Sequence, residues 1–156
     1  MTLPDIQELV PHSGAMSLLG ALLAVDAETL AAQVTIGPDT LFCNQGENGR
    51  EVGAWVGVEY MAQAVAAHAG HAARLRGEPV RVGFLLGTRR YTCAVPAFAV
   101  GSVLTIHVRR ALQAENGLAA FDCRIEDGHD GAQLASATIT VFQPGNVEAF
   151  LQGSVE

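Results

Sequence analysis

The sequence predicts an α+β protein in which one antiparallel sheet wraps around a single long central helix. Two strand-like segments precede one long alanine-rich segment, and four strand-like segments follow it. Helices therefore do not alternate with strands as they do in a doubly wound fold. The long segment is apolar nearly all round, and such a helix must be enclosed by other elements. One sheet that curls around the helix meets this need.

The first part of the chain is expected to form a short helix and a hairpin. Residues 4–10 begin with a proline and carry acidic side chains in the first turn, and Pro11 ends this helix. The apolar residues 18–25 and the alternating residues 29–37 predict two adjacent strands. Residues 37–51 are dense in Gly, Asn, Asp and Pro, which indicates a loop.

A long helix and four strands are expected to form the rest. Alanine favours helix, and we expect the helix to run from about residue 53 to Arg76, where Gly77 and Pro79 end it. A short helical turn is also expected at residues 147–151. Four strands are expected after the long helix, at residues 80–91, 102–113, 118–127 and 133–143. Asn116-Gly117 predicts a hairpin turn between the second and third of them.

Composition narrows the classes of protein. At 156 residues, the chain is expected to be one domain, 1–156, and its 49% hydrophobic content suits a compact core. A net charge of −7 argues against nucleic acid as a partner. We expect no membrane span, because Glu59 and other polar residues interrupt the apolar run. The first residues lack the basic start and apolar core of a signal peptide, so a cytoplasmic location is expected.

The cysteines and basic residues give weaker signals. The odd number of cysteines and the absence of a CxxC motif fit reduced thiols, and these are Cys43, Cys93 and Cys123. All nine basic residues are arginine. Two adjacent pairs, Arg89-Arg90 and Arg109-Arg110, could form a cationic patch that suits an anionic ligand, or could face water at the ends of strands.

Glu59 is the strongest candidate for a functional residue. It is the only formal charge between Val52 and Ala73. A carboxylate in such surroundings must be solvated by a pocket, paired or kept protonated, and each outcome makes it a candidate acid or base. Gln63 lies one turn further along the helix and can orient the carboxylate through a hydrogen bond. The alternative is a surface glutamate on an amphipathic helix.

Helical geometry assigns the remaining faces of the long segment. Four residues share one stripe: Glu59, Gln63, Ala66 and Gly70. The alanine and glycine further along this stripe let a backbone or a slender ligand approach. An adjoining apolar face is expected to be the buried one: Trp55, Val58, Ala62, Val65 and Ala69. His68 and His71 point largely the other way and are expected to be exposed or at an interface. No third ligand is evident near them, so we predict no metal site.

Two segments resemble a known family. LVPHSGAMSLLGALL (Leu9–Leu23) is similar to the Leu-Pro-His-Arg-x-Pro-Phe-Leu-Leu-Val-Asp motif of the 3-hydroxyacyl-acyl carrier protein dehydratases of fatty acid synthesis. VGAWVGVEYMAQA (Val52–Ala64) resembles the Pro-Gly-x-x-x-x-Glu-Ala-Met-Ala-Gln start of that family's helix. The chain also resembles the dehydratase-like proteins of aryl polyene gene clusters, in PHxGxM, AWVGxEYMAQ, GFLLGTRRY, ENGL, FDCRIEDG and VFQP. The resemblance implies the hotdog fold.

The resemblance also implies a reaction. In the dehydratases, a histidine and an acid contributed across a dimer interface remove water from a 3-hydroxyacyl thioester, which arrives on the phosphopantetheine arm of an acyl carrier protein. No further cofactor is implied. Glu59 would protonate the leaving hydroxyl if burial raises its pKa. The thioester oxygen gathers charge and needs N–H donors, for which the amides around Gly53, Ala54 and Trp55 are candidates.

The chain departs from the dehydratases at the catalytic histidine. The corresponding position, 14 residues before Glu59, holds Gln45, which cannot take up a proton at neutral pH. His12 is the best substitute as the base, although a structural hydrogen bond is an equal alternative for it. His107 and His129 are expected to face solvent.

Three hypotheses about function follow. The chain is a dehydratase acting on a carrier-bound 3-hydroxyacyl thioester in fatty acid or aryl polyene synthesis, a non-catalytic hotdog subunit that pairs with a catalytic partner, or an acyl thioesterase. A homodimer or heterodimer with another hotdog subunit is expected in every case. The acyl carrier protein would be acidic, as this chain is, so Arg89 and Arg90 are the candidate contacts with it.

Overall fold

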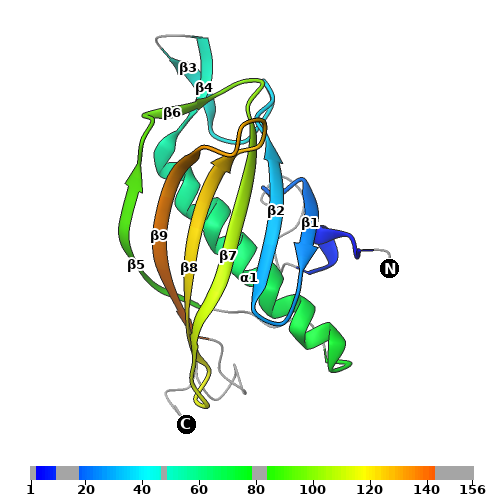
Figure 1. Ribbon diagram of the computed structural model, residues 1–156. Coiled ribbons are helices and arrows are strands. Elements are labelled where there is room, and N and C mark those ends of the chain that lie inside the picture. The colour runs from blue at the N-terminus through cyan, green and yellow to red at the C-terminus, as the bar shows by residue number, and fades with distance from the viewer. Residues whose placement is uncertain (1–2, 10–17, 47–48, 79–83, 143–156) are drawn as a thin grey trace.

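The computed structural model describes residues 3–9, 18–46, 49–78 and 84–142. A six-stranded antiparallel sheet, in the order β1-β2-β7-β8-β9-β5, wraps around one long helix (Figure 1). The strands are β1 (Ala21–Val25), β2 (Thr29–Thr35), β5 (Phe84–Cys93), β7 (Val103–Gln113), β8 (Leu118–Asp127) and β9 (Gln133–Phe142). This arrangement confirms the predicted α+β class and the hotdog fold that the resemblance implies.

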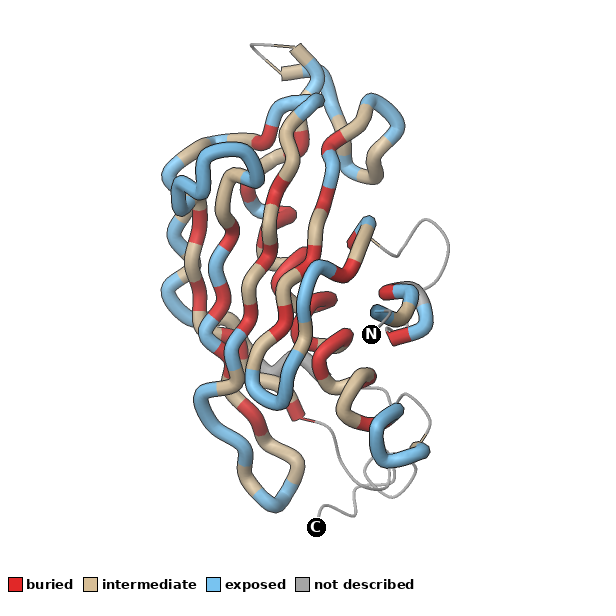
Figure 2. The backbone as a smooth tube through the Cα atoms, turned by 45° about the vertical axis from the view of Figure 1, so that its right-hand side comes forward, coloured by how far each residue is buried: buried red, intermediate tan, exposed pale blue. Residues whose placement is uncertain are grey.

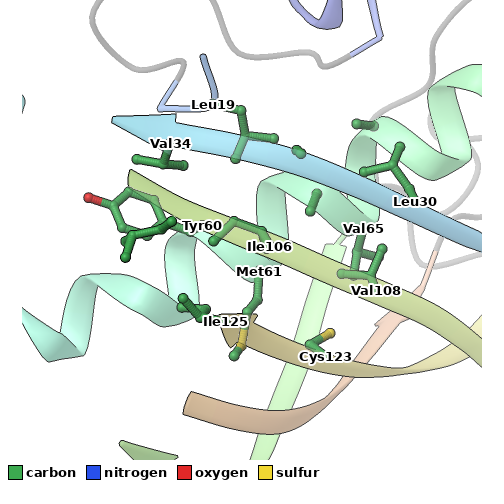
Figure 3. Close-up of a cluster of buried hydrophobic side chains, with 14 of the residues drawn as sticks. Leu19, Leu30, Val34, Tyr60, Met61, Val65, Ile106, Val108, Cys123 and Ile125 are labelled. Carbon is green, nitrogen blue, oxygen red and sulfur yellow. The ribbon is translucent and has the colours of Figure 1, made fainter. Parts of the chain in front are cut away.

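The core lies between the sheet and the helix α1 (Gly57–Leu75). Buried positions alternate along the strands, as β7 illustrates (Figure 2). These positions form one core cluster with the buried residues of the helix. Tyr60, Met61 and Val65 of α1 meet Ile106 and Val108 of β7 in this layer (Figure 3). The predicted helix is confirmed, and its first turn is a separate 3₁₀ helix, η3 (Ala54–Val56).

The buried face of α1 differs from the face that the sequence predicts. Of the five residues expected to be buried, only Val65 is, and the Trp55 side chain is 65% exposed. The buried face instead includes Tyr60, Met61 and His68. Periodicity could not select the correct face, because alanines and valines surround the helix on nearly every side.

A second, three-stranded sheet lies beyond the N-terminal end of α1 (Figure 1). It is formed by β3 (Cys43–Gly46), β4 (Gly49–Gly53) and β6 (Ala97–Ala99). The prediction of a loop over residues 37–51 is therefore wrong for the part that forms the β3–β4 hairpin. The hairpin is polar and glycine-rich, and its pairing with the distant β6 is a tertiary contact that local composition does not reveal.

The N-terminal segment packs against the stripe of small residues on α1. The helix expected at residues 4–10 is only a 3₁₀ turn, η1 (Ile6–Glu8), in the described residues. The backbone of Leu9, which follows this turn, lies so close to Gly70 that a Cβ there would overlap the Leu9 carbonyl. Arg74 and Glu8 form an ion pair of 2.7 Å beside this contact. The expected close approach of a backbone to this stripe is therefore confirmed.

The hairpins of the main sheet agree with the sequence. β1 and β2 pair as predicted, and Asn116 and Gly117 form the turn between β7 and β8. Gly117 has a φ of 94°, and the Asn116 side chain accepts a hydrogen bond of 3.1 Å from the Leu118 amide. The turn expected at residues 147–151 lies outside the described residues.

We predict that Gly70→Ala destabilises the protein by about 1–3 kcal/mol, because the new methyl group must displace the Leu9 backbone. Denaturant unfolding followed by circular dichroism measures this change. Gly87→Ala is the matched control, since no atom lies within 4 Å of a Cβ at that position. Equal free energies of unfolding for the two variants would contradict the close contact.

Candidate functional site

The carboxylate of Glu59 is held at the end of a short hydrogen-bonded chain. The Gln63 side chain, which is completely buried, donates through Nε2 to Oε1 of Glu59 at 3.4 Å. The oxygen of the same amide accepts a hydrogen bond of 2.8 Å from the backbone N–H of Leu18. Because Leu18 fixes the orientation of the amide, its nitrogen must face Glu59. Glu59 itself is half-buried, on the first turn of α1.

The polypeptide turn before α1 presents a second polar feature. The Ala54 N–H donates to the carbonyl of Pro96 at 3.0 Å, and the Ala54 carbonyl accepts from the N–H of Gly57. The Ala54 amide is thus occupied, which corrects the expectation that all amides from Gly53 to Trp55 are free. Among the described residues no acceptor is found for the Trp55 N–H. Trp55 therefore offers the available amide on the same helix end that carries Glu59.

The Tyr91 hydroxyl contacts this turn, a feature that the sequence did not reveal. Tyr91 lies on β5 and donates a hydrogen bond of 2.5 Å to the Ala54 carbonyl. Burial raises the pKa of Tyr91 well above its usual value of 10.0, so the hydroxyl remains a donor. No local pattern could have predicted a contact between residues 37 positions apart in the chain.

Exposed aromatic rings flank the helix end. The rings of Phe42 and Trp55 meet edge to face, with their centroids 5.4 Å apart. The Trp55 indole folds back over Gly53, where a Cβ would lie 2.7 Å from an indole carbon. Gln45 is exposed on the nearby strand β3, and its side chain donates to the adjacent Gly46 carbonyl at 3.4 Å. The structure thus brings Gly53 and Trp55 together beside α1 but leaves Gln45 turned to its own backbone.

The described histidines have their contacts with residues other than Glu59. His68 is 3% exposed, lies edge to face with Phe121 and has its Nε2 3.1 Å from the Ala27 carbonyl. His68 is thus buried within the chain, which corrects the expectation that it is exposed or at an interface. His71 lies three helical turns beyond Glu59, about 18 Å along the axis. His12 lies outside the described residues, so its role as the base stays a prediction.

The other two described histidines lie on the sheet and in a turn. His107 is half-buried, with its Nε2 2.7 Å from a carboxylate oxygen of Glu126. Burial and the charge of Arg124 lower the pKa of His107, and Glu126 opposes that shift. His129 is exposed, as expected, in the turn between β8 and β9. Neither ring is therefore a candidate for the base that would act together with Glu59.

The remaining residues that the sequence singled out are arginines and a buried cysteine. Arg89 and Arg90 are both exposed on β5, and Arg90 has a positive φ of 55°. Arg109 lies 3.4 Å from Asp122, so its charge is already partnered. Cys123 is buried, and burial raises the pKa of its thiol to about 12, which makes it inert.

Within residues 3–9, 18–46, 49–78 and 84–142, no group of three or more His, Cys, Asp or Glu side chains is arranged to hold a metal ion. None of the helices in these ranges has the length and apolar character needed to cross a bilayer.

Comparison with known proteins agrees with this fold. The chain resembles the dehydratase heterocomplex ApeI:P from Xenorhabdus doucetiae, with 30% identity, a TM-score of 0.87 and coverage of 99% of this chain and 100% of that one. A hypothetical thioesterase with coenzyme A from Streptococcus pneumoniae TIGR4 matches at 14% identity and a TM-score of 0.61, covering 80% and 85%. Zebra fish thioesterase superfamily member 2 matches at 14% identity and 0.63, covering 90% and 93%. The two thioesterases show the fold alone. A search of curated proteins found no match.

The fold and the structural match define a hotdog protein of the dehydratase type. A family model described as ApeP-like, ApeP dehydratase, matches residues 4–152. The chain belongs to this ApeP-like dehydratase family, which confirms the resemblance drawn from its motifs.

We predict that His68 makes the stability of the protein depend on pH. Burial, with the nearby charge of Arg110, lowers the pKa of His68 below its usual value of 6.5. The unfolded chain therefore binds the proton first, and the free energy of unfolding falls as the pH drops below about 6.5, by at most about 1.4 kcal/mol per pH unit for one proton. Urea unfolding curves recorded at several pH values between about 5 and 8 measure this slope.

His68→Gln should remove this contribution to the slope, whereas His129→Gln, which changes an exposed ring, should leave it. An identical pH dependence in the wild type and His68→Gln would contradict the assignment.

Proposed function

We propose that the chain is the acid-bearing subunit of a two-subunit hotdog dehydratase, which removes water from a 3-hydroxyacyl thioester carried by an acyl carrier protein in aryl polyene synthesis. The observation that carries the proposal is the Glu59 carboxylate, oriented by the buried Gln63 amide at the start of α1. Membership in the ApeP-like dehydratase family supports the reaction class. The phosphopantetheine arm comes with the substrate, and the protein needs no cofactor of its own.

The proposed reaction assigns one task to each group. A base removes the proton from the carbon next to the thioester, and charge collects on the thioester oxygen. The Trp55 N–H at the helix N-terminus donates to that oxygen, where the helix dipole also favours negative charge. Glu59 gives its proton to the hydroxyl on the next carbon, which leaves as water as the carbon–carbon double bond forms.

The partner subunit supplies the base in this proposal. Gln45 stands where the resemblance implies the catalytic histidine, and each described histidine lies elsewhere. The similar protein from Xenorhabdus doucetiae is a heterocomplex, which supports a second hotdog subunit as the partner here. His12 remains the candidate base within this chain.

A non-catalytic role is the second candidate, and Gln45 is the observation that favours it. In that case the partner would hold a complete site, and this chain would only stabilise it. Thioester hydrolysis is the third, and it would release free thiol without an enoyl product. The substitution of Glu59 separates these functions.

We predict that Glu59→Gln lowers kcat of the assembled complex about 100-fold or more, because glutamine keeps the size of the side chain but cannot donate the proton of an acid. The measurement is formation of the conjugated enoyl product from a 3-hydroxyacyl carrier protein, followed by absorbance and mass spectrometry. The chain alone should show little turnover.

Glu115→Gln is the matched control, since Glu115 is exposed in the turn between β7 and β8. His12→Ala tests the internal base and should leave activity unchanged if the partner supplies the histidine. Full activity of Glu59→Gln in the complex would refute the acid role and favour the non-catalytic one. Release of free thiol alone would favour hydrolysis.

We also predict that Arg89→Glu weakens binding of the acyl carrier protein about tenfold at low salt, and less at high salt, because an exposed cation attracts the acidic carrier. Arg90→Glu should act in the same direction. Isothermal titration calorimetry at two ionic strengths measures the change. Arg76→Glu, at the far end of α1, is the charge-matched control. Equal affinities for wild type and Arg89→Glu would exclude the patch.

A further inference from the structure

A β-bulge on the edge strand β5 turns Tyr91 toward the start of α1. Arg89 pairs with Thr138 and Thr92 pairs with Ser136, so one extra residue is inserted between the two pairs. In a regular strand, Tyr91 would share the outer face with Arg89. The bulge, at which Arg90 takes a φ of 55°, reverses that alternation. The Tyr91 hydroxyl therefore lies beneath the sheet, against Ala54.

Gly57 leaves the space that the Tyr91 hydroxyl occupies. A Cβ at Gly57 would overlap the hydroxyl oxygen and would also lie 2.9 Å from Ile125 Cδ1. The Ala54 carbonyl accepts two hydrogen bonds here, one from the Gly57 N–H and one from Tyr91. The neighbouring Ala54 N–H is held by Pro96, which precedes β6. The strand β5 and the segment before β6 thus hold the two peptide units on either side of Ala54.

We propose that Tyr91 is a positioning residue that fixes the turn at Ala54, so that the Trp55 N–H points to the place where the thioester oxygen develops charge. This inference deepens the proposed function and rests on it. Tyr91 does not touch the substrate in this proposal. It acts through Ala54, whose carbonyl belongs to the peptide unit that contains the Trp55 N–H.

That shared peptide unit gives the proposal its physical basis. The Ala54 carbonyl and the Trp55 N–H lie in one plane, since the bond between them does not rotate freely. A hydrogen bond to the carbonyl therefore also sets the direction of the N–H. Preorganised donors aid catalysis because they need no reorientation as charge develops. An Arg in the left-handed region is a local strain of the kind found at functional sites.

Tyr60 supplies a matched comparison. Its side chain is completely buried on the first turn of α1, but its hydroxyl has no hydrogen-bond partner in the described residues. Its ring lies 6.4 Å from that of Phe98, in the core. Tyr60→Phe therefore removes a buried hydroxyl near the same helix end without touching Ala54.

We predict that Tyr91→Phe lowers kcat of the complex about 10- to 100-fold with little change in KM, because the donor to the transition state is misdirected while substrate contacts remain. Tyr60→Phe should leave kcat unchanged. Hydrogen exchange of the isolated chain, measured by NMR, should show faster exchange of the Gly57 amide in Tyr91→Phe and not in Tyr60→Phe, since Ala54 is no longer held.

Gly57→Ala provides a second, independent variant, because it displaces the hydroxyl without removing it. It should reproduce the loss of kcat, and the double variant with Tyr91→Phe should lose less than the product of the two single effects. Unchanged kcat and unchanged exchange in Tyr91→Phe would overturn the inference. If the wild-type complex shows no dehydration, the proposed function fails, and exchange alone then decides whether Tyr91 holds the turn.

Discussion

The fixed position of the first turn of α1 is the constraint on which the rest of the site depends. The apolar helix is enclosed by the main sheet, and η3, the 3₁₀ turn that leads into it, is fastened to β5 through Tyr91 and to the segment before β6 through Pro96. Glu59 lies in the first turn of α1, directly after η3, and Gln63 lies one turn further on. Because the helix end cannot shift independently of the sheet, the carboxylate and the Trp55 amide keep a fixed relation.

The same turn joins the fold to its chemistry. Burial of Tyr60 and Met61 holds the helix against the sheet, while the opposite side of its first turn keeps Glu59 half-buried. In the proposed function, one helix end therefore combines an acid with a donor for an oxyanion, the two groups that dehydration of a thioester needs besides a base. The proposal takes the base from a partner subunit, because the described histidines contact residues other than Glu59.

The sequence was sufficient for the fold class, the long helix, the four later strands and the pairing of Glu59 with Gln63. These features depend on local composition and on spacing along one helix. It was insufficient for the β3–β4 hairpin and the buried face of α1, which tertiary packing decides. Tyr91 was missed for a related reason, since a bulge at Arg90 reverses the face to which alternation would assign it.

The most direct test is a crystal structure of the chain with its partner subunit and a stable 3-hydroxyacyl thioester analogue. The account predicts that the analogue's hydroxyl lies about 2.6–3.2 Å from the Glu59 carboxylate, with the thioester oxygen at the Trp55 N–H and a histidine of the partner beside the intervening carbon. An analogue bound wholly within the partner, with the Glu59 carboxylate facing open solvent, would contradict it.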